Sequence, residues 1–139
     1  MMVIDASAVV ELLLGGRRAE PVIPWFEDHE GRLHAPGLLD VEVAQALRRL
    51  ARSGFMAAGR ARAAVELLQE LPVDRHLETP LLPRMWELRG NPTAYDAGYV
   101  ALAEALGCAL LTFDVALAGA PELPVEVEEG AGYIHKLAG

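Results

Sequence analysis

Short apolar runs alternate with longer amphipathic segments along the chain. Apolar runs of a few residues are typical of buried strands, whereas apolar residues that recur every three to four positions are typical of packed helices. The apolar runs predict strands at residues 3–4, 32–35, 108–112 and 125–127, with a possible strand opening at residue 73. The amphipathic segments predict helices over residues 6–14, 19–29, 39–53, 61–71, 79–89 and 93–106, and a short helical turn up to Gly119.

Strands that alternate with helices pair in parallel through crossover connections. The pattern therefore predicts an α/β fold in which helices cover both faces of a parallel sheet. In such folds, ligands bind at the carboxyl ends of the strands, near the point where the strand order reverses. We expect the functional residues at that edge of the sheet.

The length and composition predict a single domain over residues 1–139. A chain of 139 residues that is 53% hydrophobic is long enough to bury a sizeable core, and we see no internal repeat, low-complexity tract or linker. No apolar window approaches the length of a membrane span, and the first residues lack the features of a signal peptide. We therefore expect a cytoplasmic protein without membrane contact. The single cysteine, Cys108, excludes an internal disulfide framework and is best interpreted as a small buried hydrophobic residue.

The net charge of −8 argues against a nucleic-acid partner, because proteins that bind polyanions usually present a basic face. The charge is unevenly distributed, however: residues 1–70 carry a net charge of −2 and residues 71–139 carry −6. The basic clusters are Arg17-Arg18, then Arg48, Arg49 and Arg52, then Arg60 and Arg62. Solvated helix faces paired with nearby Glu are the simpler interpretation of these arginines. Their clustering, and the fit of a guanidinium to phosphate oxygens, leaves RNA open as a partner.

Four carboxylates occupy positions where an α/β fold would place a functional site. Asp5 ends the first predicted strand, and Asp114 follows the apolar strand at residues 108–112. Glu42 and Asp96 lie in the first turns of two predicted helices. If the strands that precede Asp5 and Asp114 are neighbours, all four side chains can face one pocket at the sheet edge.

Anions packed together repel one another, so such a pocket makes sense with a hard divalent cation. Magnesium binds through a few carboxylates, retained waters and substrate phosphate oxygens, and manganese is the natural alternative. The chemistry that follows is metal-assisted hydrolysis of a phosphodiester by an activated water.

Each acid also has a purely structural interpretation. Asp5 and Asp114 precede helical segments and can serve as N-caps. Thr93 and Asp96 fit the capping-box pattern, and Glu42 can be a solvent-facing residue near a positive helix end. The occurrence of acids at two strand ends and two helix starts favours the functional interpretation.

At these residues the chain resembles the PIN-domain ribonucleases, and most closely the VapC toxins. Four segments match the family's motifs in order: VIDAS at residues 3–7, DVEVAQALRR at 40–49, TAYDAGYVALAE at 93–104 and LLTFD at 110–114. The resemblance covers nearly the whole chain, and the third segment is its most specific part. It implies a three-layer α/β/α sandwich with a parallel five-stranded sheet in the order 3-2-1-4-5.

The resemblance also implies roles for individual residues. Asp5, Glu42, Asp96 and Asp114 match the family's acidic metal site, while the hydroxyls of Ser7 and Thr112 match those that support the carboxylates or a bound water. Within this site, Asp5, Asp96 and Asp114 are expected to be ligands, and Glu42 a ligand or a base that orients the water. Two departures stand out: Gln45 replaces an Asn found in many relatives, and residues 115–117 lack an extra acid that some relatives have.

The family resemblance implies partners as well. It predicts an endoribonuclease with an RNA substrate, a VapB-type antitoxin that neutralises it, and a homodimer. A non-catalytic binding module on the same fold remains the main alternative. A receiver-like phosphoacceptor domain is a weaker one, because Ala6 replaces the second acid that it needs after the first strand and Lys136 is a poor substitute for its lysine. An Asp-nucleophile phosphatase would need an acid where Ser7 stands.

The histidines and aromatic residues favour structural roles. His34 is more typical of a packed or surface histidine than of a ligand, and His29, His76 and His135 are interpreted in the same way. The aromatic residues Trp25, Phe26, Phe55 and Trp86 are expected to be core or interface anchors, because an aromatic content of 6% offers no series of stacking platforms.

Overall fold

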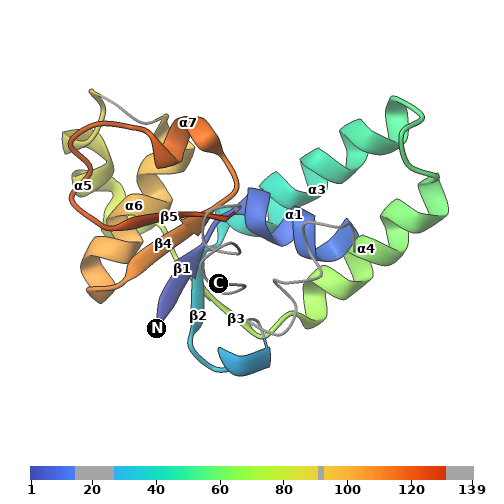
Figure 1. Ribbon diagram of the computed structural model, residues 1–139, viewed down its shortest axis with the longest axis horizontal. Coiled ribbons are helices and arrows are strands. Elements are labelled where there is room, and N and C mark those ends of the chain that lie inside the picture. Colours follow the sequence, from blue (N-terminus) through green and yellow to red (C-terminus); the bar gives the residue numbers. More distant parts are fainter. Residues whose placement is uncertain (15–26, 91–92, 131–139) are drawn as a thin grey trace, which may run out of the picture.

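The computed structural model describes residues 1–14, 27–90 and 93–130 (Figure 1). Its strands are β1 (Met2–Ile4), β2 (Leu33–Pro36), β3 (Val73–His76), β4 (Ala109–Thr112) and β5 (Val127–Glu129). Its helices are α1 (Ala6–Leu14), α3 (Leu38–Arg52), α4 (Ala58–Glu70), the 3-10 helix η1 (Thr79–Leu81), α5 (Leu82–Glu87), α6 (Ala94–Leu106) and α7 (Val115–Ala118). Most of the helix predicted over residues 19–29 lies outside the described residues, as do Arg17, Arg18, Trp25 and Phe26.

The five strands form one parallel sheet in the order β3-β2-β1-β4-β5. β1 pairs with β2 on one side and with β4 on the other, so the strand order reverses at β1. In register, Ile4 at the end of β1 lies beside Leu111 of β4. The predicted α/β class and strand order are confirmed, and the edge where β1 and β4 end is the switch point of the fold.

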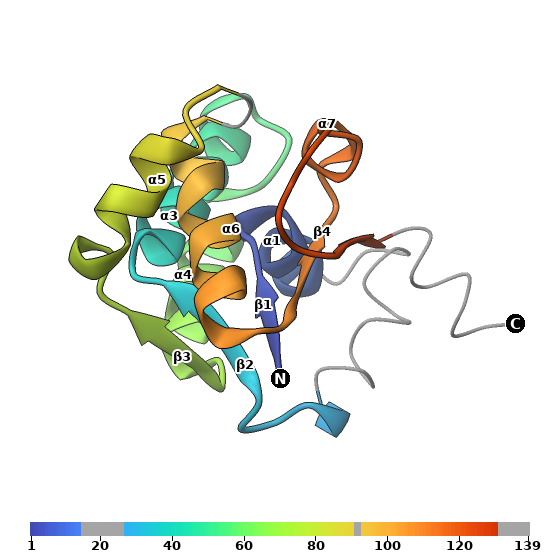
Figure 2. The same cartoon turned by 90° about the vertical axis from the view of Figure 1, so that its left-hand side faces the viewer.

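Helices cover the two faces of the sheet. α1, α3 and α4 pack together on one face, whereas α5 and α6 pack together on the other (Figures 1 and 2). α6 contacts β1, β2 and β4, so it lies across the centre of the sheet. α3 and α4 form a long hairpin that extends away from the sheet in Figure 1. In the part of the chain that the structure describes, no helix is long and apolar enough to cross a membrane.

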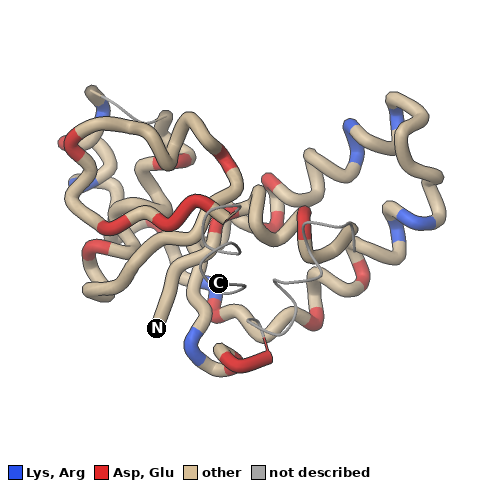
Figure 3. The backbone as a smooth tube through the Cα atoms, viewed as in Figure 1, with Lys and Arg blue, Asp and Glu red and all other residues tan. Residues whose placement is uncertain are grey.

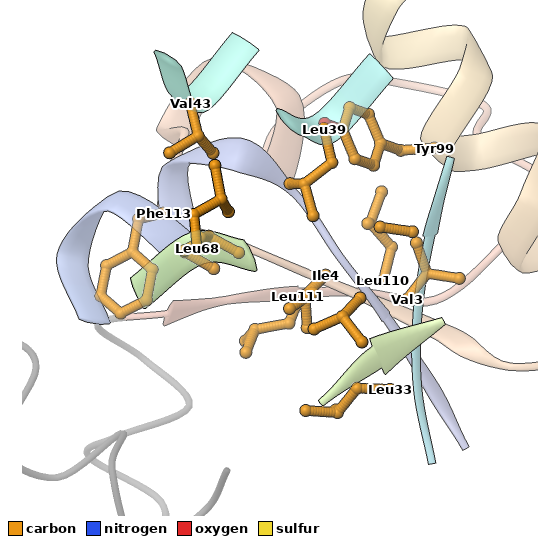
Figure 4. Close-up of a cluster of buried hydrophobic side chains, with 14 of the residues drawn as sticks. Val3, Ile4, Leu33, Leu39, Val43, Leu68, Tyr99, Leu110, Leu111 and Phe113 are labelled. Carbon is orange, nitrogen blue, oxygen red and sulfur yellow. The ribbon is translucent and has the colours of Figure 1, made fainter. Parts of the chain in front are cut away.

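The core lies between the central strands and both helical layers. Val3, Ile4, Leu110 and Leu111 are essentially inaccessible to solvent, and they meet side chains from α3, α4 and α6 (Figure 4). Strands buried on both faces read as continuous apolar runs, which is the pattern that predicted β1 and β4. The same packing fixes the ends of these strands, from which the candidate site residues follow.

The helix predicted over residues 79–89 is divided into η1 and α5. Pro83 has no N–H with which to close an α-helical turn onto the Thr79 carbonyl. The Leu82 N–H bonds that carbonyl instead, which gives the tighter 3-10 turn. The single-helix prediction was wrong because it considered Pro80 at the helix start and not Pro83 within it.

The last strand lies two residues beyond its predicted position at residues 125–127. β5 pairs Val127 with Leu110, and it continues through Glu128 and Glu129. β5 is an edge strand, where charged side chains such as those of Glu128 and Glu129 are common.

Two aromatic residues that were expected in the core or at an interface are exposed. The Phe55 residue is 79% exposed at the turn between α3 and α4, and Trp86 is 68% exposed on α5, where the Arg89 guanidinium stacks 4.5 Å from its ring centre. Neither residue belongs to the core, so that part of the prediction was wrong. Cys108 is half-buried and packs against the core.

Truncating a central strand residue should strongly destabilise the fold. Leu110 is completely buried in β4, so Leu110→Ala leaves a cavity that should lower the free energy of unfolding by about 2–5 kcal/mol. Urea denaturation measures the change. Leu77→Ala is the matched control, because Leu77 is 72% exposed and its truncation should have little effect. Equal losses in both variants would contradict the assignment of the core.

Candidate active site

The candidate site lies at the carboxyl ends of β1 and β4. Asp5 directly follows β1, and its backbone N–H donates to the carbonyl of Leu111 in β4 at 3.1 Å. Asp114 follows β4 after one intervening residue, Phe113. Neighbouring parallel strands therefore deliver both acids to one edge of the sheet, as the sequence predicted.

Asp5 is buried and held from several directions. The Ser7 hydroxyl donates to Oδ1 of Asp5 at 2.6 Å, and the backbone N–H of Ala8 donates to the same oxygen at 3.0 Å. The Thr112 hydroxyl donates to Oδ2. Asp5 thus caps the start of α1 and joins β1 to β4, so its carboxylate has one fixed orientation.

Ser7 and Thr112 also accept hydrogen bonds from the segment that carries Asp114. The Phe113 N–H donates to the Ser7 hydroxyl at 2.8 Å, and the Asp114 N–H donates to Oγ1 of Thr112 at 2.9 Å. Both hydroxyls therefore connect the Asp5 carboxylate to the backbone before Asp114. The structure brings these residues together, and their support of catalysis stays a prediction.

Asp114 is exposed and acts as the N-cap of α7. Its Oδ1 accepts from the N–H groups of Ala116 at 2.9 Å and Leu117 at 3.3 Å. This is the capping role that the sequence also allowed, and it leaves Oδ2 free of those bonds. Asp96 lies in the first turn of α6, where its N–H donates to the Thr93 hydroxyl at 3.2 Å, as the capping pattern predicts.

The sequence suggested that Glu42 lies in the first turn of its helix, but the structure places it in the second turn. α3 begins at Leu38, one residue before the predicted start, and the Leu38 N–H donates to the Glu78 carboxylate; Glu42 is therefore the fifth residue of the helix, just beyond its first turn. Glu42 is half-buried instead of facing solvent, and its Oε1 is buried without a hydrogen-bond partner among the described residues. The hydroxyl of Tyr99, on α6, is in the same situation.

The acids repel one another, with Asp96 at the centre. Burial raises the pKa values of Asp5, Glu42 and Asp96, and charge repulsion raises them further. Asp96 interacts with each of the other three acids, and Asp5 also interacts with Glu42. Burial and these carboxylates together raise the pKa of Tyr99, so its hydroxyl stays protonated. The four predicted acids therefore share one electrostatic environment. Within the described residues, Asp114 takes part in it through its charge interaction with Asp96.

The donor set fits a hard divalent cation. Carboxylates that repel one another, and a buried Glu42 oxygen without a partner, are what a cation such as magnesium would neutralise. Within residues 1–14, 27–90 and 93–130, no three acidic, His or Cys side chains already enclose an ion position.

A groove of about 600 Å³ opens beside the acids, between α1 and α3. Ser7 and Glu42 line it at the acidic end, together with Tyr95 and Phe113. Arg49 lies further along α3 in the same groove. A molecule bound at the acids therefore has an adjoining space along α3.

Sequence reasoning missed two features of the protein. Tyr99 lies within the most specific matching segment, but its apolar surroundings in the sequence gave no signal that its hydroxyl faces Glu42. The second feature is a pair of histidines on neighbouring strands, in which Nδ1 of His34 lies 2.8 Å from Nε2 of His76. Only the register of β2 with β3 brings these two rings together.

A family model and a curated relative match most of the chain. Residues 2–123 match the model of the PIN domain. The ribonuclease VapC9 of Mycobacterium tuberculosis is 43% identical over 129 residues, which cover 91% of this chain and 98% of the relative.

Solved structures share the fold at low sequence identity. PAE2754 from Pyrobaculum aerophilum superposes with a TM-score of 0.72 at 24% identity, covering 99% of this chain and 88% of that one. The DNA-bound VapBC of Salmonella typhimurium gives a TM-score of 0.70 at 10% identity, covering 93% of this chain and 97% of that one. These similarities confirm the three-layer fold.

Burial of the acids, together with their repulsion, predicts an unusual dependence of stability on pH in metal-free buffer. The pKa of Asp96 is raised above its ordinary value of 3.8, so the folded state keeps a proton that the unfolded chain has released. The free energy of unfolding should therefore fall as the pH rises from about 4 through the folded pKa, and Asp96→Asn should remove this loss. Urea denaturation from about pH 4 to about pH 7 with EDTA measures the difference.

Glu104→Gln provides a control of opposite sign. The Arg84 guanidinium lowers the pKa of Glu104, so that pair stabilises the fold above the ordinary pKa of 4.5 and less as the pH falls. Glu104→Gln should thus be less stable than the wild type at neutral pH, where Asp96→Asn should be more stable. An Asp96→Asn protein that is destabilised equally at every pH would contradict the described repulsion.

Proposed function

Because the chain belongs to the PIN-domain family and, within it, to the VapC ribonucleases, we propose that it is a metal-dependent endoribonuclease that acts as a toxin. The observation that carries the proposal is that Asp5 and Asp114 follow neighbouring strands at one edge of the sheet, beside a buried Glu42 oxygen that has no hydrogen-bond partner among the described residues. A fold gains no stability from such an arrangement, so its presence at the switch point indicates a function for the charges.

Asp5, Asp96 and Asp114 would hold the ion, with Glu42 as a further ligand or as the base beside it. Magnesium or manganese, when bound, would polarise the scissile phosphate and lower the pKa of a coordinated water. Asp5 is suited to the ligand role because Ser7, Ala8 and Thr112 fix its carboxylate. Asp114 is suited to it because only one of its oxygens serves the helix cap.

Glu42 is suited to orienting the attacking water and accepting its proton. Its buried Oε1 has no partner among the described residues, and burial raises the pKa of its carboxyl above the ordinary value. The Tyr99 hydroxyl lies beside this carboxylate and remains protonated, so it can donate to Glu42 or to the water. The substrate proposed for this site is RNA, because the named relative is a ribonuclease.

We also propose a VapB-type antitoxin as the partner that neutralises the protein, and a homodimer as its assembly. The structural neighbour from Salmonella typhimurium was crystallised as a DNA-bound VapBC complex, which supports an antitoxin partner for this chain. The named relative supports the same assignment, because it carries the VapC name.

Substitution of the central acid should remove toxicity. Expression of the wild type in a bacterial host without an antitoxin should arrest growth and create new RNA ends. Asp96→Asn should do neither, because the substitution removes a negative charge that is proposed to hold the metal ion. Asp74→Asn is the matched control, since Asp74 is exposed on β3 and interacts with His34 instead of the acidic site. Equal toxicity of the wild type and Asp96→Asn would contradict metal-dependent cleavage, and growth without RNA cleavage would favour a non-catalytic binding module.

Metal removal should abolish cleavage by the purified protein. EDTA should stop the hydrolysis of a labelled RNA, and added magnesium or manganese should restore it. Glu42→Gln should lower the rate by roughly 10²–10⁴-fold if Glu42 acts as the base. Gel analysis of the cleavage products measures both effects. Full activity in EDTA would refute the proposed role of the acids.

A further inference from the structure

The hairpin of α3 and α4 carries a charge opposite to that of the rest of the chain. Residues 43–65 contain five arginines and no Asp or Glu, although the net charge of the chain is −8. Figure 3 shows these basic segments gathered toward the end of the hairpin that is remote from the sheet. A local field of this sign attracts polyanions even when the whole protein is acidic.

Three of these arginines have no partner among the described residues. Arg48, Arg49 and Arg52 are exposed on the last turns of α3, and neither a hydrogen bond nor an ion pair within the described chain involves their side chains. Every other described arginine has a partner. Arg49 and Arg52 lie in the last turn of α3, where a positive charge favours the helix end, but their mutual repulsion leaves them a strong local field directed at solvent.

The groove connects one of these arginines, Arg49, to the acidic site. Its wall on α3 runs from Glu42 through Gln45 and Ala46 to Arg49, which is one face of the helix. Arg49 lies seven residues after Glu42, or about 10 Å along the helix axis. Arg52 lies one turn beyond Arg49. A chain of phosphates that leaves the acidic site along α3 would therefore meet these two guanidinium groups in succession.

An exposed aromatic ring stands beyond the arginines. Phe55 lies at the turn of the hairpin, and it is 79% exposed although the next residue, Met56, is buried. Exposed aromatic rings among cationic side chains are the combination that binds single-stranded nucleic acid, because bases stack on the rings while the cations hold the phosphates.

We propose that the groove and the end of the hairpin form a track that binds the single-stranded RNA flanking the cleavage site. Arg49 and Arg52 hold phosphates of the strand, and Phe55 stacks against a base further along. This proposal rests on the proposed function, since it places the scissile phosphate at the acids. We favour RNA over an acidic peptide because the track begins at a site for phosphodiester chemistry and ends at an exposed aromatic ring.

The test measures RNA binding separately from cleavage. Every binding variant carries Asp96→Asn to prevent turnover, and the probe is a fluorescein-labelled oligouridylate of roughly 12 nucleotides. Arg49→Gln with Arg52→Gln should weaken binding, and the slope of log K against log salt should become shallower by about 1.4, or about 0.7 for each lost phosphate contact. Arg32→Gln with Arg89→Gln is the control with the same change in charge, and it should leave the slope unchanged.

The aromatic part of the track is tested separately. Phe55→Ala should weaken binding of the same probe at least about fivefold, with little change in the salt slope. Leu77→Ala removes another exposed apolar side chain, which directly follows β3 and lies outside the groove, and should have no effect. Circular dichroism of each variant checks that the fold is retained.

The outcomes separate this proposal from the proposed function. If the wild type cleaves RNA and neither the arginine pair nor Phe55 affects binding, the track is refuted and the nuclease assignment stands. If the variants lose RNA binding but the wild type cleaves no RNA, the arginines and Phe55 bind RNA in a protein that is not a nuclease, and the assignment of the track to a cleavage site fails with the nuclease assignment. If RNA binding is unchanged while binding to an oligoglutamate probe is lost, the arginines serve an acidic protein partner and the proposal is overturned.

Discussion

Repulsion among carboxylates at the edge where β1 and β4 end is the interaction on which the rest of the site depends. Asp5 is buried at this edge, and Asp96 interacts with each of the other three acids. Such a cluster raises the free energy of the folded state in the absence of a counter-charge. The fold bears this cost through its core, in which the strands that deliver Asp5 and Asp114 are almost completely buried.

Two hydroxyl groups fix the geometry of the site in spite of this repulsion. Ser7 and Thr112 donate to Asp5 and accept from the backbone that leads to Asp114, so the ends of two strands are fixed relative to each other. Glu42 lacks such support, and the hydroxyl beside its carboxylate is that of Tyr99. The site thus combines a carboxylate of fixed orientation with one that has no such support, which fits the ligand and base roles that we propose for Asp5 and Glu42.

Much of the fold could be predicted because the central strands are short apolar runs and their order follows the family pattern. The acids could be placed at strand ends and helix starts because the apolar patterns that predicted those elements also fixed their bounds. What could not be predicted depended on contacts between distant residues. Glu78 accepts a hydrogen bond from the first residue of α3, and the register of β2 with β3 joins His34 to His76. Phe55 was expected to be buried or at an interface, because a sequence pattern does not show that a helical hairpin ends in solvent.

The central claim is that one cation relieves the repulsion among these acids. Calorimetric titration of manganese into the metal-free protein near pH 6, in two buffers that differ in ionisation enthalpy, measures binding together with the protons released. Raised carboxyl pKa values predict that binding releases protons, and that Asp96→Asn both weakens binding and reduces the release. Binding that is unaffected by Asp96→Asn, or that releases no protons, would contradict the account.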